Sequence, residues 1–147
     1  MPEAKKMIAK TGVEVIKHFI GRNQMMVVKE MLKGEEKTFF ADKIAELAKT
    51  ISEMPKSYET DGQGNKAIVH LHYFKNSCDW YIIEKDVGSP DDIETGVQLQ
   101  AYGFANLGDT QNAELGYISI QELIEHNVEL DFHFAPCTLE EVKQKMN

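Results

Sequence analysis

The feature that most constrains the fold of this chain is a change in the spacing of its apolar residues near position 60. Up to residue 55, apolar side chains recur at the spacing of one helix face. Beyond residue 65, runs rich in β-branched and aromatic residues are separated by turn-forming residues, which is typical of strands. The segment between these regions, 60–65, contains two glycines, an aspartate and an asparagine. The sequence therefore predicts helices followed by a sheet.

Three helices are predicted before residue 55. Thr11 and Glu14 have the spacing of a capping box, which would start the first helix at residue 11. Asn23 and Thr38 are suitable caps for the second and third helices, and Pro55 is a natural stop. We interpret residues 1–38 as a helical N-terminal extension and residues 39–147 as an α+β domain.

Five strands are predicted after the turn, at 67–74, 80–84, 97–104, 115–118 and 129–134. Because they follow one another with short connections, an antiparallel meander is favoured. Gly103 and Gly116 lie within two of these strands, where a glycine indicates a bulge or a close approach of backbones. The expected fold class is α+β, with an antiparallel β-sheet of four to five strands packed with helices and preceded by the helical extension.

Two short helices are predicted in the second half. Ser119 and Glu122 form a capping box for a helix that ends near residue 125. Thr138 and Glu141 form another for a C-terminal helix over 139–146. The apolar positions around the first of these boxes are predicted to be buried in the core: Leu115, Tyr117, Ile120 and Leu123.

The charge of the chain is unevenly distributed. Its net charge is −8, yet residues 1–60 carry 11 basic and 9 acidic side chains, whereas residues 61–147 carry 5 and 15. An acidic second half repels phosphates, so direct binding of nucleic acid by this half is disfavoured. The simpler interpretation is a solvated acidic face that maintains solubility.

Neither membrane insertion nor secretion is predicted. No apolar run approaches the roughly 18 residues that a membrane span needs. The first residues lack the apolar region of a secretory signal. Two cysteines, Cys78 and Cys137, are too few for a disulfide framework and are interpreted as reduced thiols of a cytoplasmic protein.

Five sequence blocks follow one another in the second half. They are an apolar strand ending at Phe74, a strand at 79–86, the segment 103–108, a Glu-Leu-Gly-Tyr block at 114–117 and an Asp-Phe-His-Phe block at 131–134. In this order they resemble the family catalogued as domain of unknown function 2958, over most of the chain beyond its first helices.

The resemblance spans about residues 39–142. It implies the kind of genetic element that encodes such proteins, and it implies no reaction. Members resemble components of phages, plasmids and conjugative elements, sometimes within polyvalent proteins that accompany antirestriction functions. Members usually have a longer link before the last strand, which is shortened here to 125–129. No catalytic residue is carried over from the family.

A metal site is one candidate chemistry. His70 and His72 are two residues apart, so on a strand both side chains would point to one face. His133, Glu84 or Asp131 would complete a set of three ligands. The alternative is that these histidines lie on the solvent face of a strand. No cofactor is predicted.

A second candidate is a polar site at the strand ends, comprising Glu84, Asp86, Glu114, Asp131 and His133. Paired carboxylates there would serve as acid and base, or bind a divalent cation. The alternative is that these charges prevent edge-to-edge pairing of sheets.

Cysteine chemistry is a third candidate. Cys78 or Cys137 would act as a nucleophile, with His133 four residues before Cys137 as its base. The simpler interpretation is that both cysteines are small, partly buried apolar residues.

A candidate interaction surface comprises Met25, Met26, Met31, Trp80 and Tyr117. Clustered methionines provide an adaptable contact surface, although core packing is the simpler interpretation.

The resulting hypothesis is that the chain is a small cytosolic accessory protein of a phage, plasmid or conjugative element and binds a protein partner. A more specific version is that it acts in counter-defence through an acidic protein-binding surface. The alternative is a metal- or carboxylate-dependent hydrolase using His70, His72, Glu84, Asp131 and His133. A further option is homo-oligomerisation through the N-terminal helices.

Overall fold

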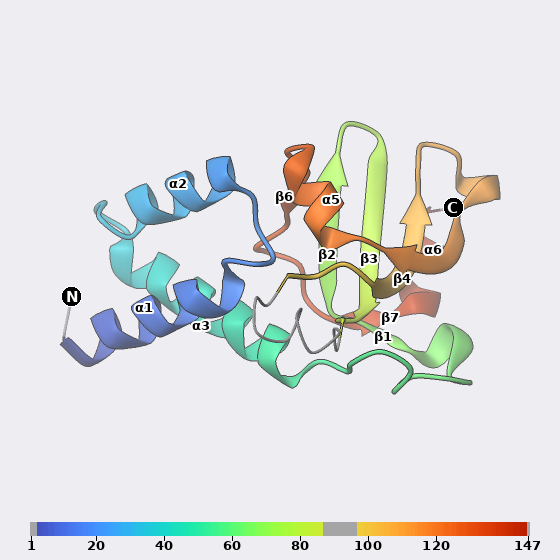
Figure 1. Cartoon of the computed structure of the whole chain (residues 1–147), viewed down its shortest axis with the longest axis horizontal. Helices are drawn as coiled ribbons and strands as arrows, with labels where there is room; N and C mark the ends of the chain where they lie inside the picture. Colours follow the sequence, from blue (N-terminus) through green and yellow to red (C-terminus); the bar gives the residue numbers. More distant parts are fainter. Residues whose placement is uncertain (1–2, 87–96, 147) are drawn as a thin grey trace.

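The computed structural model describes residues 3–86 and 97–146 and has the predicted α+β architecture. Three helices, α1 (Glu3–Ile16), α2 (Arg22–Met31) and α3 (Lys37–Glu53), gather at one end of the molecule (Figure 1). The sheet, with α5 (Ile120–Glu125) and α6 (Leu139–Met146), occupies the other end. None of the described helices is long and apolar enough to cross a membrane.

The main sheet has five antiparallel strands in the order β5-β4-β3-β2-β6. Its strands are β2 (Leu71–Lys75), β3 (Cys78–Glu84), β4 (Ala101–Asn106), β5 (Glu114–Ile118) and β6 (Glu129–Leu130). β1 (Ile68–Val69) and β7 (Cys137–Thr138) form a separate antiparallel pair. The predicted meander is confirmed for β2 to β5, whereas β6 returns to the far side of β2.

The two faces of the sheet pack against different elements because side chains alternate along each strand. Leu71 and Tyr73 point into a large core shared with the N-terminal helices. Ile83 and Phe104 point the other way, into a smaller core with Leu139 of α6. Both faces of the central strands are therefore covered.

Residues 1–38 contribute directly to the large core. Ile16, Phe19, Ile20 and Val28 are buried in the same cluster as Tyr73 of the sheet. The Tyr73 hydroxyl also donates to the carbonyl of Phe19 in the α1–α2 connection, so this connection and the sheet are joined by a polar contact as well. The boundary proposed at residue 38 stays a prediction, but the residues on its two sides share one core.

The helix starts were predicted with mixed success. Ser119 accepts from the Glu122 amide at 3.1 Å, and Thr138 accepts from the Glu141 amide at 3.1 Å, so both caps in the second half are confirmed. The first helix begins at Glu3 instead of at the Thr11 box. Likewise Asn23 and Thr38 lie inside α2 and α3, which have Gly21 and Glu36 at their N-caps.

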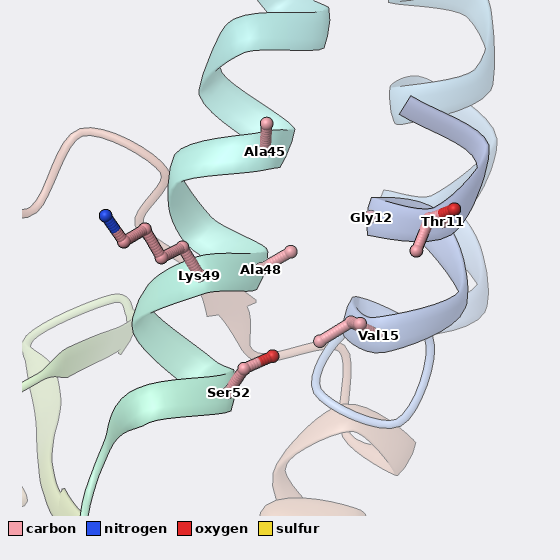
Figure 2. A pocket seen from close by; sticks show the side chains of 7 residues that line it. All are labelled: Thr11, Gly12, Val15, Ala45, Ala48, Lys49 and Ser52. Carbon is pink, nitrogen blue, oxygen red and sulfur yellow. The ribbon is translucent and has the colours of Figure 1, made fainter. Parts of the chain in front are cut away.

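The reason that α1 continues past Gly12 is its packing against α3. A Cβ on Gly12 would lie 2.9 Å from Ile44 Cγ2, so only glycine permits this close approach of the two helices. Beside the contact is a shallow hollow of about 330 Å³ (Figure 2) that is lined by small or short side chains of both helices and by Lys49 of α3. Tertiary packing thus outweighs the local capping signal.

The strand predictions need three corrections. The strand expected over 67–74 is interrupted at His70 and divided between two sheets. Residues 97–100 precede β4 without joining it, and 131–134 leave the sheet after β6. Leu115 and Tyr117, expected in the core, are exposed because β5 is an edge strand, whereas Ile120 and Leu123 are buried as predicted.

Candidate functional site

The five residues predicted to form one polar site are used in different parts of the fold. Glu84 is buried at the end of β3, and Glu114 is exposed at the start of β5. Asp131 and His133 do lie together, since the His133 amide donates to Asp131 Oδ1 at 2.9 Å. The arrangement does not assemble a five-residue site.

Glu84 and Asp86 each anchor a loop. Glu84 Oε1 accepts from the Tyr58 amide at 2.8 Å, and its Oε2 accepts from the amide and hydroxyl of Thr60. Asp86 Oδ2 accepts from the amides of Leu99 and Gln100 at 3.2 and 3.0 Å. A buried carboxylate such as that of Glu84 is tolerated when its oxygens accept hydrogen bonds in this way. Both side chains thus fix the backbone of other segments, Glu84 at residues 58–60 and Asp86 at residues 99–100.

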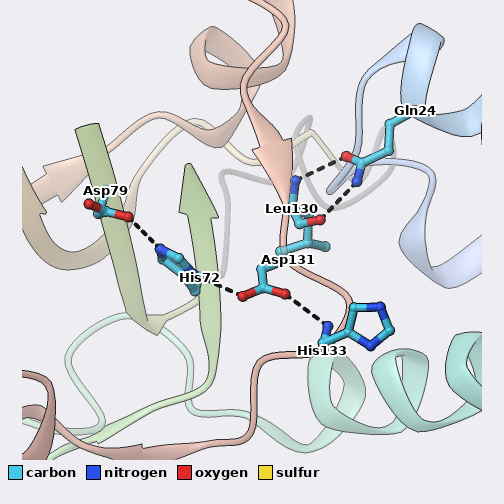
Figure 3. Close-up of polar contacts among 6 residues, drawn as sticks. All are labelled: Gln24, His72, Asp79, Leu130, Asp131 and His133. Atoms are coloured by element: carbon cyan, nitrogen blue, oxygen red, sulfur yellow. Dashed lines mark hydrogen bonds and ion pairs between the residues drawn. The ribbon is translucent and has the colours of Figure 1, made fainter. Parts of the chain in front are cut away.

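A histidine held between two aspartates lies on the smaller-core face of the sheet (Figure 3). His72 Nδ1 is 3.1 Å from Asp131 Oδ2, and its Nε2 is 2.7 Å from Asp79 Oδ1. Asp79 is on β3, whereas Asp131 directly follows β6. The Asp131 amide also donates to the His72 carbonyl at 2.8 Å. The cluster therefore joins the β2–β3 hairpin to the segment that leaves the sheet.

Aromatic rings surround this cluster. The His72 ring stacks on Tyr81 with centroids 4.7 Å apart and an interplanar angle of 10°, and Phe134 lies 5.6 Å away. Burial, with the nearby charges of Asp79, Cys137 and Asp131, raises the pKa of Tyr81 to about 12. Tyr81 therefore remains a neutral, packed side chain over the ordinary pH range.

This geometry gives His72 a structural role. Each ring nitrogen faces a carboxylate oxygen, so neither is free to ligate a metal or accept a proton from a substrate. His70 lies at the break between β1 and β2, where burial lowers its pKa. Within residues 3–86 and 97–146, no group of three or more His, Cys, Asp or Glu side chains is arranged to hold a metal ion.

The cysteines occupy unrelated positions. Cys78 begins β3 and Cys137 begins β7, and both are half-buried thiols. Burial raises the pKa of Cys137, which disfavours the thiolate that a nucleophile needs. The structure gives no support to the predicted Cys137–His133 pair.

Two adjoining hollows follow the segment 131–136. One of about 350 Å³ lies between this segment, α2 and β6, and one of about 440 Å³ lies between it and α3. Phe132 and His133 line both. The second also receives His70 and a mixture of charges from α3, namely Lys43, Glu46, Lys49 and Glu53. Charges of both signs along its wall define no single class of ligand.

The predicted interaction surface is divided. Met25 and Trp80 pack against the large core, and Met31 lines a hollow beside α2. Met26 and Tyr117 are each 60% exposed, but they lie on α2 and β5, at opposite ends of the molecule. Core packing thus accounts for part of the set, and the exposed members belong to two surfaces.

The two edges of the main sheet differ in how their backbone is satisfied. At β6, Gln24 of α2 donates from Nε2 to the Leu130 carbonyl at 2.8 Å and accepts the Leu130 amide on Oε1 at 3.0 Å (Figure 3). The side-chain amide therefore takes the place of a neighbouring strand. This contact protects the β6 edge from pairing with other chains.

At β5, no described residue hydrogen-bonds to the backbone outside the ladder with β4. β5 has five residues and contains neither Lys nor Pro, the residues that commonly block an edge. Its side chains Leu115 and Tyr117 are exposed, and the Tyr117 hydroxyl lies 2.8 Å from that of Tyr58, itself 66% exposed. Leu107, in the β4–β5 connection, is 66% exposed. This open edge is the clearest candidate for a binding site.

Several contributing residues were missed from the sequence. The strand expected over 80–84 does not include Asp79, yet the hairpin turn is only Asn76-Ser77 and pairs Lys75 with Cys78. A two-residue turn at Asn76 would have placed Asp79 close to His72 on one face. By contrast, Gln24 and Tyr58 carried no local signal, because their partners are far away in the chain.

Comparison of the chain with models of protein families, with curated proteins and with solved structures gives no match. The resemblance to the family of unknown function stays a prediction.

Proposed function

We propose that this protein is an interaction module that binds an extended segment of a protein partner by adding it as a strand to β5. The observation that carries this proposal is the difference between the two sheet edges. One edge is occupied by Gln24, whereas no described residue pairs with the outer side of the five-residue strand β5, where Leu115 and Tyr117 are exposed. In strand addition, the backbone supplies affinity and alternate side chains supply specificity.

The chemistry of this edge favours an apolar or aromatic partner strand. Leu115 and Tyr117 project to the same face because they are two residues apart. Tyr58 extends this aromatic surface through its hydroxyl contact with Tyr117. Cross-strand pairs of aromatic and branched residues are favourable in sheets.

The negative charge of residues 61–147 is not the basis of the proposed binding surface. Many of its described carboxylates form polar contacts within the chain: Asp79, Glu84, Asp86, Asp109, Glu125, Asp131 and Glu141. Their use in holding local structure argues for apolar docking rather than for mimicry of nucleic acid.

The cellular setting is part of the same proposal. Two unpaired thiols suit a cytosolic protein, and the sequence resemblance indicates an accessory protein of a phage, plasmid or conjugative element. The hydrolase alternative draws less support, because its residues do not form one site and His72 has no free ring nitrogen.

A pair of variants tests the proposed function. Tyr117→Lys places a charge on the open edge, and Met26→Lys places the same charge at an equally exposed position on α2. We expect a partner captured from host lysate to be retained by wild type and Met26→Lys and lost by Tyr117→Lys. Purified partner should also slow amide exchange in β5. Retention by Tyr117→Lys together with loss by Met26→Lys would overturn the proposal, and circular dichroism verifies that both variants are folded.

A further inference from the structure

The open edge has a sequence that is complementary to itself. If two β5 strands run antiparallel about a two-fold axis at Gly116, Leu115 of each copy lies opposite Tyr117 of the other. These residues are exposed and share one face of the sheet, so the pairing continues that face across both copies. Glu114 then lies opposite Ile118, and no carboxylate faces another.

Electrostatics favour this antiparallel arrangement over a parallel one. Glu114 is the only charged residue of β5. A parallel in-register pair would bring two Glu114 side chains directly opposite each other, which is destabilising. In the antiparallel pair they are four positions apart along the strand, or about 13 Å. That separation exceeds the screening length of about 8 Å at physiological ionic strength.

The centre of the proposed pair offers no steric obstacle. Gly116 has no side chain, and a Cβ built on it meets no atom within 4 Å. When the two backbones pair at the ordinary spacing of neighbouring strands, no side chains face each other at the axis. The opposite edge is occupied by Gln24, which limits association to pairs.

We infer that the strand added to β5 is the β5 strand of a second copy, in an antiparallel two-fold pair centred on Gly116. This inference rests on the proposed function, since it names the occupant of the same edge. Pairing of two copies should also depend on salt concentration. Each copy carries a net charge of −8, so long-range repulsion opposes pairing and added salt strengthens it.

Sedimentation of the full-length chain from micromolar to millimolar concentration tests the inference. We expect a monomer–dimer equilibrium that tightens with salt, and a dissociation constant about 10-fold higher or more for Tyr117→Lys. Met26→Lys should associate as wild type does. A chain that stays monomeric over the whole range, or association that depends on Met26 instead of Tyr117, would overturn the inference.

A cysteine at the two-fold axis tests the register. Directly opposite residues of an antiparallel pair have Cα atoms about 4.5–5.5 Å apart, which is within disulfide range. Gly116→Cys should therefore form a covalent dimer under mild oxidation. Wild type, with its two half-buried native thiols, and Gly34→Cys, in an exposed turn, should not. Equal cross-linking of all three proteins would exclude the register.

The two proposals fail in different ways. If the chain is monomeric and still binds a lysate protein in a Tyr117-dependent manner, the second copy is excluded as the added strand, but strand addition to β5 is still supported. If the chain is monomeric and its captured partners are unaffected by Tyr117→Lys, both the pairing of two copies and strand addition to β5 are excluded.

Discussion

The two edges of the sheet solve the same physical problem in opposite ways. Every edge strand exposes unpaired amide and carbonyl groups that can pair with another chain. β6 is two residues long and its Leu130 backbone is satisfied by Gln24. β5 is five residues long, carries exposed Leu115 and Tyr117, and has no described residue covering its outer edge. Among the residues that the structure describes, one edge is protected by a long-range contact and the other is not, and this difference is the basis for the proposal that β5 binds a further strand.

The exposed residues near β5 are also held in place by a buried residue. Glu84 binds the backbone of Tyr58 and Thr60, and Tyr58 in turn contacts Tyr117. The side chains of the open edge are therefore positioned by a buried carboxylate on β3.

Removing the buried carboxylate should have the largest effect. Glu84→Ala leaves two amides and a hydroxyl without their acceptor, so we expect the free energy of unfolding to fall by about 4 kcal/mol. Glu114→Ala removes an exposed glutamate from the open edge and should change it by less than about 0.5 kcal/mol. Urea unfolding of both variants measures the difference. Similar losses in the two would contradict the anchoring role of Glu84.

Two glycines that face each other across β4 and β5 should respond differently to the same substitution. Gly103 pairs with Gly116. A Cβ on Gly103 would lie 2.0 Å from the Tyr81 carbonyl oxygen, whereas one on Gly116 meets nothing within 4 Å. Gly103→Ala should cost about 3 kcal/mol and Gly116→Ala less than about 0.5 kcal/mol, measured by urea unfolding. A tolerated Gly103→Ala would show that β3 and β4 separate more easily than their contact indicates.

Weakening the protected edge should have an intermediate effect. Gln24→Ala leaves the Leu130 amide and carbonyl without their side-chain partner, and we expect a loss of about 2 kcal/mol in the free energy of unfolding. Asn23→Ala on the same helix removes an exposed contact with Asn127 and should cost less than about 0.5 kcal/mol. Faster amide exchange at Leu130 in Gln24→Ala alone would locate the effect at β6. Equal stability of the two variants would contradict the protective role of Gln24.

The parts of the fold that the sequence predicted are those specified locally. The capping boxes at Ser119 and Thr138 need only residues three positions apart, and both form. The meander follows from short connections between consecutive strands, and Gly103 marked a true close approach.

The errors arise where distant residues decide the outcome. Thr11 has a capping pattern, but α1 continues past it because Gly12 packs against α3. Tyr117 has the pattern of a core residue, but sheet order places its strand at an edge. Sheet order is a property of the whole chain, and so is the site that depends on it. The local sequence therefore could not distinguish Gly116 from Gly103, although their roles are opposite.

The smallest expected effect is a pH dependence on the β6 side of the sheet. His70 lines the hollow beside segment 131–136, and burial lowers its pKa below the ordinary value of 6.5. The unfolded chain consequently binds this proton more tightly than the folded chain does. The contribution of neutral His70 is therefore fully present above pH 6.5, and the free energy of unfolding decreases as the pH falls below that value. His70→Gln cannot take up the proton, so its urea-unfolding stability should decline less than that of wild type between pH 7.5 and pH 5. Parallel declines would show that His70 is as accessible to protonation in the folded chain as in the unfolded one.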